Sequence, residues 1–166
     1  MELGCLMLVS VWIRPGGHDD GPFVNEMARH ACVIEDRPLP AADAVEVVAM
    51  LPQAADAVVV ATDDASAPIG ACWWHFPEPP LLRADDGTAV PEMVMAVVAD
   101  GRGRGVGTAL VDALAARAAA AFDRLALNVH IRNPAVRLYS RTGFEVAGKG
   151  RGPLGVAMVR ALRAPR

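Results

Sequence analysis

The hydrophobic and polar positions along the chain follow two alternating periods, which predict short strands interspersed with short helices. Apolar runs bounded by turn residues predict strands, and apolar residues spaced three or four apart predict helices. The predicted strands cover 8–14, 57–62, 68–76, 92–99, 125–131, 144–147 and 154–162. The predicted helices cover 19 or 20 to about 32, 43–51, 108–122 and 134–142. This succession of elements predicts a layered α/β or α+β fold.

The segment 77–91 separates the third predicted strand from the fourth. It contains four prolines, two aspartates and a glycine, and we therefore expect a long exposed loop. Loops of this length in compact domains are often functional. The strand that follows, 92–99, is apolar on both faces after Glu92, as is typical of a central strand.

The composition indicates one domain with an aliphatic core. A chain of 166 residues has the length of a single domain, so residues 1–166 are expected to form one. Apolar residues make up 53% of the chain but aromatic residues only 5%. Aliphatic side chains must therefore fill most of the interior.

Charge and cysteine content exclude several classes of protein. A net charge of −3 argues against a nucleic acid as the main partner. Cys5, Cys32 and Cys72 are odd in number and widely spaced, which indicates neither a disulfide framework nor a metal site. A reducing cytoplasm fits this pattern. The apolar run 3–13 is too short to span a bilayer, so no membrane association is expected.

The segment 102–107 reads Arg-Gly-Arg-Gly-Val-Gly and lies between a buried strand and a long helix. In this setting successive backbone N–H groups converge on an anion, and the helix N-terminus adds partial positive charge. The segment therefore predicts a phosphate site. It has no lysine, which excludes a Walker A loop, and its glycine spacing does not fit the dinucleotide fingerprint.

A second motif follows the fifth predicted strand. Asn133 is a helix cap, Pro134 suits the first helical position, and Gly143 suits the position just past the end. This short helix carries Tyr139, the only tyrosine in the chain.

The two motifs together resemble a known family. Segment 97–110 resembles motif A of the GCN5-related N-acetyltransferases (GNAT), and segment 133–144 resembles the motif that follows it in that family. The chain departs from the common pattern at Ala99, where many relatives have proline. The interval from Asn133 to Tyr139 is also one residue shorter than the commonest form. The resemblance implies a mixed, mostly antiparallel central sheet of six to seven strands flanked by about four helices.

By this resemblance the chain binds acetyl-CoA in a V-shaped opening between the fourth and fifth strands. The acetyl group then moves directly to a primary amine, without a covalent enzyme intermediate and without a metal. The resemblance implies that the cofactor-binding residues are Met95, Val97, Val98, Arg102, Gly103, Arg104, Gly105, Val106, Gly107, Thr108, Asn133 and Tyr139. Asn133 could instead serve only as a helix cap.

The same resemblance assigns two catalytic roles. Tyr139 matches the family tyrosine that protonates the departing CoA thiolate. Glu92 opens the fourth strand, where family members often place the carboxylate that deprotonates the amine, directly or through water. His75, His130 and water are the alternatives for this base.

The sequence leaves the acceptor open. Glu78, Asp85 and Asp86 in the proline-rich loop would suit a cationic amine, either a small molecule or a protein amine, and a homodimer is left open. Two other functions compete with the enzyme. One is a non-catalytic acyl-CoA sensor of the same fold. The other is a nucleic-acid-binding domain that uses the arginines at 102, 104, 117 and 124, which the acidic net charge disfavours.

Overall fold

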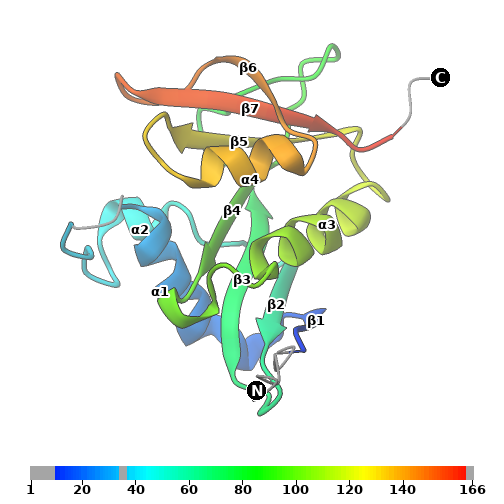
Figure 1. Cartoon of the computed structure of the whole chain (residues 1–166). Coiled ribbons are helices and arrows are strands. Elements are labelled where there is room, and N and C mark those ends of the chain that lie inside the picture. The colour runs from blue at the N-terminus through cyan, green and yellow to red at the C-terminus, as the bar shows by residue number, and fades with distance from the viewer. Residues whose placement is uncertain (1–9, 34–36, 164–166) are drawn as a thin grey trace, which may run out of the picture.

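A single twisted sheet forms the centre of the molecule (Figure 1). The computed structural model describes residues 10–33 and 37–163. The strands are β1 (Trp12–Pro15), β2 (Val58–Thr62), β3 (Pro68–His75), β4 (Glu92–Val97), β5 (Arg124–His130), β6 (Glu145–Lys149) and β7 (Gly155–Ala161). The helices are α1 (Gly21–Ala31), α2 (Val45–Val48), α3 (Val106–Ala118) and α4 (Ala135–Arg141), with 3₁₀ turns at His18–Asp20 and Ala99–Gly101. No helix in the described ranges is long and apolar enough to cross a membrane.

The strand order is β1-β2-β3-β4-β5-β7-β6, and every neighbouring pair is antiparallel except β4 and β5. The predicted mixed, mostly antiparallel sheet is therefore confirmed, with seven strands and four α-helices among the described residues.

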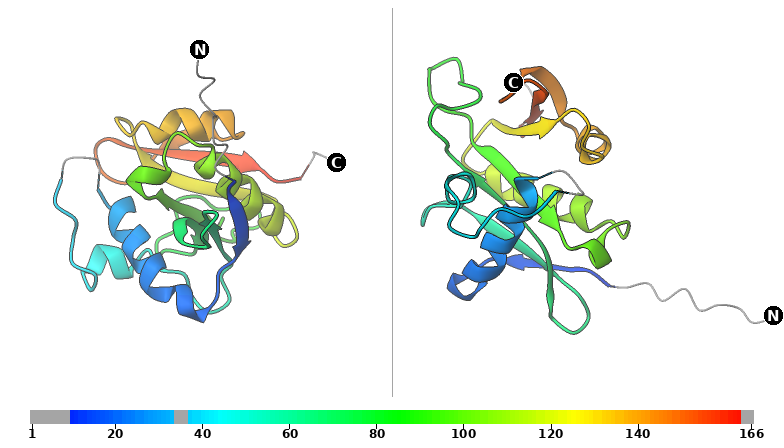
Figure 2. Two further views of the ribbon diagram at one scale, coloured as in Figure 1. Left: turned by 60° about the horizontal axis from the view of Figure 1, so that its bottom comes forward. Right: turned by 90° about the vertical axis from the view of Figure 1, so that its left-hand side faces the viewer.

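An apolar core lies on each face of the sheet. Successive residues of a strand point to opposite faces, and β3 supplies one tryptophan to each core. Trp73 packs with α1 and α2, and its Nε1 donates a hydrogen bond to the Met50 carbonyl at 2.8 Å. Trp74 packs on the α3 face, edge-to-face against Phe122. Figure 2 (right) shows α1 and α3 on opposite sides of the sheet.

The centre of the sheet opens between β4 and β5. These parallel strands pair at a single position, Glu92 with Ala126, whereas β4 pairs with β3 and β5 pairs with β7 along their full lengths. Beyond that pair the two strands diverge, and in Figure 1 β5 runs across the end of an upright β4. We call the space between residues 94–97 and 128–130 the fork.

Several predicted boundaries were wrong, for local reasons. The predicted helix 43–51 is a single turn, Val45–Val48, because only Val47 of that turn is buried while Val45 is 83% exposed. The strand predicted over 92–99 ends at Val97, because the chain then enters the 3₁₀ turn Ala99–Gly101, in which the N–H of Gly101 donates to the carbonyl of Val98.

Three other segments also differ from expectation. Helix α3 begins at Val106 rather than 108, after Gly105 in the left-handed conformation, and ends at Ala118 rather than 122. The 77–91 loop is only partly exposed, because Val90 is buried and Arg83 bridges to Ala89. The first strand begins at Trp12 among the described residues, and its predicted first two positions, like Cys5, lie outside them.

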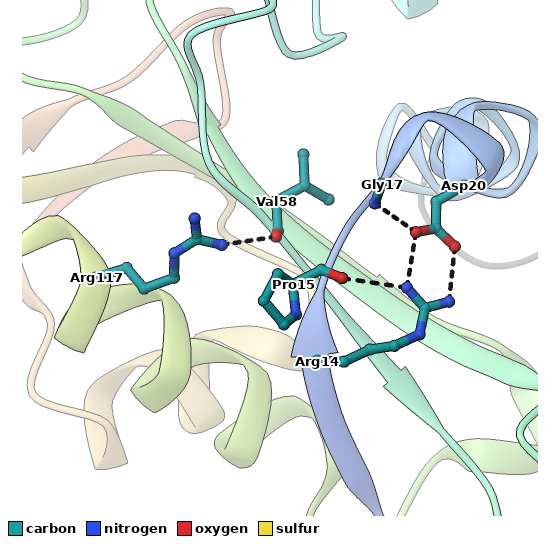
Figure 3. Close-up of polar contacts among 6 residues, drawn as sticks. All are labelled: Arg14, Pro15, Gly17, Asp20, Val58 and Arg117. Atoms are coloured by element: carbon teal, nitrogen blue, oxygen red, sulfur yellow. Dashed lines mark hydrogen bonds and ion pairs between the residues drawn. The ribbon is translucent and has the colours of Figure 1, made fainter.

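An ion pair fastens the edge strand β1 to the start of α1 (Figure 3). The Arg14 guanidinium donates hydrogen bonds of 2.7 and 2.8 Å to the two carboxylate oxygens of Asp20, which also accepts one from the N–H of Gly17 at 2.7 Å. The hydrogen bonds from Arg14 lower the pKa of the Asp20 carboxyl. Burial raises this pKa by a smaller amount, and the hydrogen bond from Gly17 lowers it further. Nearby, Arg117 of α3 donates to the carbonyl of Val58 at 3.0 Å.

We predict that Asp20→Asn lowers the free energy of unfolding by about 1–3 kcal/mol at neutral pH, because a charge-assisted pair is lost. The folded-state pKa of Asp20 lies below its unfolded value. Its contribution is therefore complete above the unfolded value of about 3.9 and disappears as the pH falls through the folded one.

Urea unfolding at pH 7 and about pH 3 measures this difference between wild type and variant, which should shrink at the lower pH. The exposed neighbour Asp19, changed to Asn, is the matched control. A difference that is the same at both pH values would contradict the assigned role of the pair.

Candidate active site

A cavity of about 560 Å³ occupies the fork. Residues from both faces of the sheet line it: the ends of α1 and α2 on one side, and the start of α3 with α4 on the other. The predicted site residues in its wall are Met95, Val97, Arg102, Gly103, Gly105, Val106, Gly107, Thr108, Asn133 and Tyr139. A cavity of this size and lining is typical of a small-molecule site.

The edge of β4 that faces the cavity presents backbone polar groups. The N–H of Ala126 donates to the carbonyl of Pro91, and the N–H of Val98 donates in the opposite direction to Ile69. Backbone groups of successive strand residues alternate in direction. Odd-numbered residues of β4 therefore direct their N–H and C=O toward β5, which places those of Met95 and Val97 in the fork.

The glycine-rich turn forms the mouth of the cavity on the α3 face. Gly103 and Gly105 have φ angles of +74° and +77°, a region that residues with a side chain rarely adopt. Gly105 caps α3, so the free N–H groups of its first turn point into the cavity mouth. At Gly107 an added Cβ would lie 2.7 Å from Leu138 Cδ1, so any larger residue there requires the Leu138 side chain of α4 to move.

Arginines surround this mouth. Arg102, whose Nε donates to the carbonyl of Val97 at 3.3 Å, lines the cavity together with Arg137 and Arg141 of α4. Guanidinium groups beside a helix N-terminus favour an anionic ligand. This end of the cavity is suited to phosphate groups.

Helix α4 places Tyr139 in the cavity wall. Asn133 Oδ1 accepts a hydrogen bond from the N–H of Ala135 at 2.9 Å, which is the contact of a helix cap. Tyr139 is 8% exposed and stacks edge-to-face on Phe144. Burial, and to a lesser degree the neighbouring Cys72, raise the pKa of the Tyr139 hydroxyl above its ordinary value. The phenol is therefore protonated at neutral pH.

Glu92 lies at the closed end of the fork, not in the cavity wall. The side chain is buried, and Arg151 Nη2 donates to Oε2 at 2.9 Å while Arg151 Nη1 donates to Oε1. Oε2 also accepts from the N–H of Leu81 at 3.0 Å. The bonds to Glu92 raise the pKa of Arg151. The pair joins β4 to the 77–91 loop and to the β6–β7 turn.

The two candidate histidines are also outside the cavity wall. His75 pairs with Glu92 across β3 and β4. Burial lowers its pKa, although the carboxylate of Glu92 and the backbone of Ala49 oppose the shift. His130 accepts a hydrogen bond at Nδ1 from the N–H of Arg132 at 3.1 Å.

The structure brings together most of the predicted binding residues and adds others. Val98 and Arg104 do not line the cavity. The cavity-lining residues that the sequence analysis missed include His30, Met50, Asn128, Arg137 and Arg141. Asn128 carried a usable signal, because it is a polar residue in the middle of an otherwise apolar strand. His30 and Met50 carried none, since their position depends on tertiary packing.

Comparison with known protein families shows which family the chain belongs to. The model of the acetyltransferase (GNAT) domain matches residues 54–146, more than half of the chain. The chain belongs to the GNAT acetyltransferase family. The match spans both strands of the fork, the glycine-rich turn and α4, and the predicted family is thereby confirmed. A search of curated protein sequences found no match.

Solved structures confirm the GNAT fold. YncA of Salmonella typhimurium, described as an acetyltransferase and solved with acetyl-CoA, superimposes with a TM-score of 0.68 at 17% identity, covering 95% of this chain and 96% of that one. An acetyltransferase structure from Acinetobacter baylyi gives 0.70 at 16%, covering 95% and 94%. A GCN5-related N-acetyltransferase from Kribbella flavida gives 0.64 at 22%, covering 91% and 97%.

Proposed function

We propose that the protein transfers an acetyl group from acetyl-CoA to a primary amine, directly and within a ternary complex. One observation carries the proposal. One cavity is lined by the start of α3 with arginines beside it, by the edge of β4 that β5 leaves without strand pairing, and by a buried, protonated tyrosine. Each of the three corresponds to one part of the reaction: holding the donor, aligning it and protonating the leaving group.

The residues present fit acetyl-CoA as the donor. The turn at 102–107 and the arginines beside it match a pyrophosphate, because backbone N–H groups and guanidiniums are donors for phosphate oxygens. The backbone groups of Met95 and Val97 match the amides of an extended pantetheine chain in the fork. When bound there, acetyl-CoA supplies the activated acetyl thioester.

Tyr139 holds the proton that the departing sulfur needs. A phenol with a pKa raised by burial remains protonated at neutral pH, and a CoA thiol resembles cysteine, with a pKa of about 8.5. Because burial disfavours the phenolate and the thiol is the stronger acid, full proton transfer to the thiolate is uphill, so the Tyr139 O–H stabilises the departing sulfur first by donating a hydrogen bond to it. The side chain lines the cavity close to the edge of β4, where the sulfur would lie.

Glu92 is our candidate for the group that receives the proton from the amine, acting through water. The carboxylate does not line the cavity, so an amine bound in the cavity cannot pass its proton directly to Glu92 in the described structure. Its ion pair with Arg151 holds the carboxylate in place at the closed end of the fork. His75 and His130 stay alternatives.

We predict that Gly105→Glu abolishes acetyl-CoA binding. The new carboxylate would stand at the α3 start, where the pyrophosphate is proposed to bind, and repel it. Titration calorimetry measures the affinity. Gly87→Glu is the matched control, because Gly87 also has a positive φ (+86°) and open space around it, but lies in the 77–91 loop. Equal affinity in the two variants would refute the site.

We predict that Tyr139→Phe lowers kcat at least tenfold and leaves acetyl-CoA affinity nearly unchanged, since positioned proton transfer contributes about 10²–10⁴ in rate. Release of CoA thiol with a saturating amine measures kcat. Because the pKa of Tyr139 is raised, no loss of rate from its ionisation is expected below about pH 10. Wild-type turnover in the variant, with chemistry rate-limiting, would leave Tyr139 a packing residue.

We predict that Glu92→Gln flattens the acidic limb of kcat/KM against pH, after correction for ionisation of the amine. The variant should also lose about 1–3 kcal/mol of unfolding free energy, a range reduced because Arg151 is 41% exposed. Arg151→Gln is the comparison: it breaks the same pair but retains the carboxylate, so an acidic limb should still be present even though kcat/KM itself is lower. If His75→Ala or His130→Ala flattens the limb instead, Glu92 is not the base.

A further inference from the structure

Asn128 lies in the cavity but has no part in the chemistry described above. It stands in the middle of β5, two residues beyond the Ala126–Glu92 pair. Parallel pairing places its side chain on the same sheet face as Val94, which packs with α1 and α2. Tyr139 belongs to the core on the opposite face. Asn128 and Tyr139 thus approach the fork from opposite sides.

The orientation of the Asn128 amide is fixed by its neighbour. Oδ1 accepts a hydrogen bond from the backbone N–H of Arg151 at 2.8 Å. A backbone N–H can only donate, so the oxygen must face the β6–β7 turn and the amide cannot be flipped. Among the described residues none accepts a hydrogen bond from Nδ2. The group that Asn128 presents to the cavity is therefore a donor.

The turn that holds Asn128 is itself held in place. The Arg151 side chain bonds to Glu92 and, through Nη2, to the carbonyl of Pro79 at 3.0 Å. Gly150 donates to the carbonyl of Gly155 at 2.9 Å. A Cβ at Gly150 would lie 2.1 Å from Asn128 Oδ1, so the turn packs directly on the amide. The donor is preorganised before any ligand arrives.

We propose that Asn128 binds the amine substrate and selects amines with a carbonyl or carboxylate oxygen on the carbon next to the amine-bearing carbon, as in α-amino acids and their amides. This inference rests on the proposed acetyl transfer. The Asn128 side chain is exposed to the cavity. A substrate that covers Nδ2 without accepting its hydrogen bond removes this donor from water and destabilises the complex, and a plain alkylammonium offers only donors. Because Asn128 is on the face opposite Tyr139, the oxygen it binds belongs to the acceptor and not to the leaving group.

The surroundings of Asn128 suggest the size of such a substrate. Ala31 and Val33 at the end of α1, with Met50 after α2, line the cavity on the same face of the sheet. These apolar side chains suit a small aliphatic group on the amine-bearing carbon. L-Alaninamide, L-alanine and isopropylamine form a matched set: they share this carbon skeleton around the nitrogen and differ in the oxygen-bearing group.

The decisive variant is Asn128→Asp. Aspartate has the same shape and its oxygen can still accept from the N–H of Arg151, but the donor becomes a negatively charged acceptor. We measure kcat/KM of the full chain with acetyl-CoA for the three amines, at equal concentrations of free base. Wild type should prefer L-alaninamide over isopropylamine by about tenfold, the value of one hydrogen bond. L-Alanine against L-alaninamide shows whether a carboxylate or a neutral carbonyl is bound better.

In Asn128→Asp the preference should disappear, because kcat/KM for L-alaninamide falls to the value for isopropylamine in the same variant. Asn25→Asp is the matched control, because its amide donates to the Ala42 carbonyl outside the cavity, and it should retain the preference. No preference in wild type, or an equal loss for all three amines in Asn128→Asp, overturns the inference but not the acetyl transfer. Bound acetyl-CoA without thiol release from any amine overturns both.

Discussion

The pairing of β4 with β5 at a single position is the constraint on which the site depends. Buried backbone N–H and C=O groups need partners, and in most sheets the adjacent strand supplies them. Here each strand is fully paired on its outer side and nearly unpaired on the inner one. The fork thus has a row of donors and acceptors that the adjacent strand does not satisfy, in the middle of the sheet where two cores hold it rigid; of these, the Val97 carbonyl accepts a hydrogen bond from Arg102. An extended ligand that enters the fork acts as the missing strand.

The closed end of the fork explains why the strands do not pair further or separate entirely. Glu92 is the one residue of β4 that pairs with β5, and its carboxylate forms an ion pair with Arg151, 59 positions away in the chain. That arginine also contacts the 77–91 loop and, through its backbone, Asn128. Four segments therefore meet at one ion pair. Removing either partner would leave the other charge in a partly desolvated position, and the effect would reach both the angle of the fork and the orientation of Asn128.

The parts of the fold and of the site that depend on short stretches of sequence could be predicted from the sequence. The glycine-rich turn and α4 are each specified within about a dozen residues, by glycines, capping residues and helical spacing. The structure confirms the capping hydrogen bond of Asn133 and the start of a helix after Gly105. Neither the fork nor the Glu92–Arg151 pair has a local signal, because both depend on which strands become neighbours. The one-turn α2 shows the reverse case: its apolar residues fit a longer helix, yet with only Val47 buried in that turn, tertiary packing stabilises no more than one turn.

The two faces of the fork offer opposite chemistry. On the α3 face the cavity has arginines, the N–H groups of the first turn of α3 and a phenol, which in the proposed acetyl transfer would serve a negatively charged donor and its leaving group. On the α1 face it has mostly apolar side chains, with His30 at the end of α1 and the oriented amide donor of Asn128 as the polar groups. Because the strands that separate these faces are held apart, the two reactants can bind from opposite sides and meet between them. Direct transfer requires this geometry, since neither reactant then has to leave before the other enters.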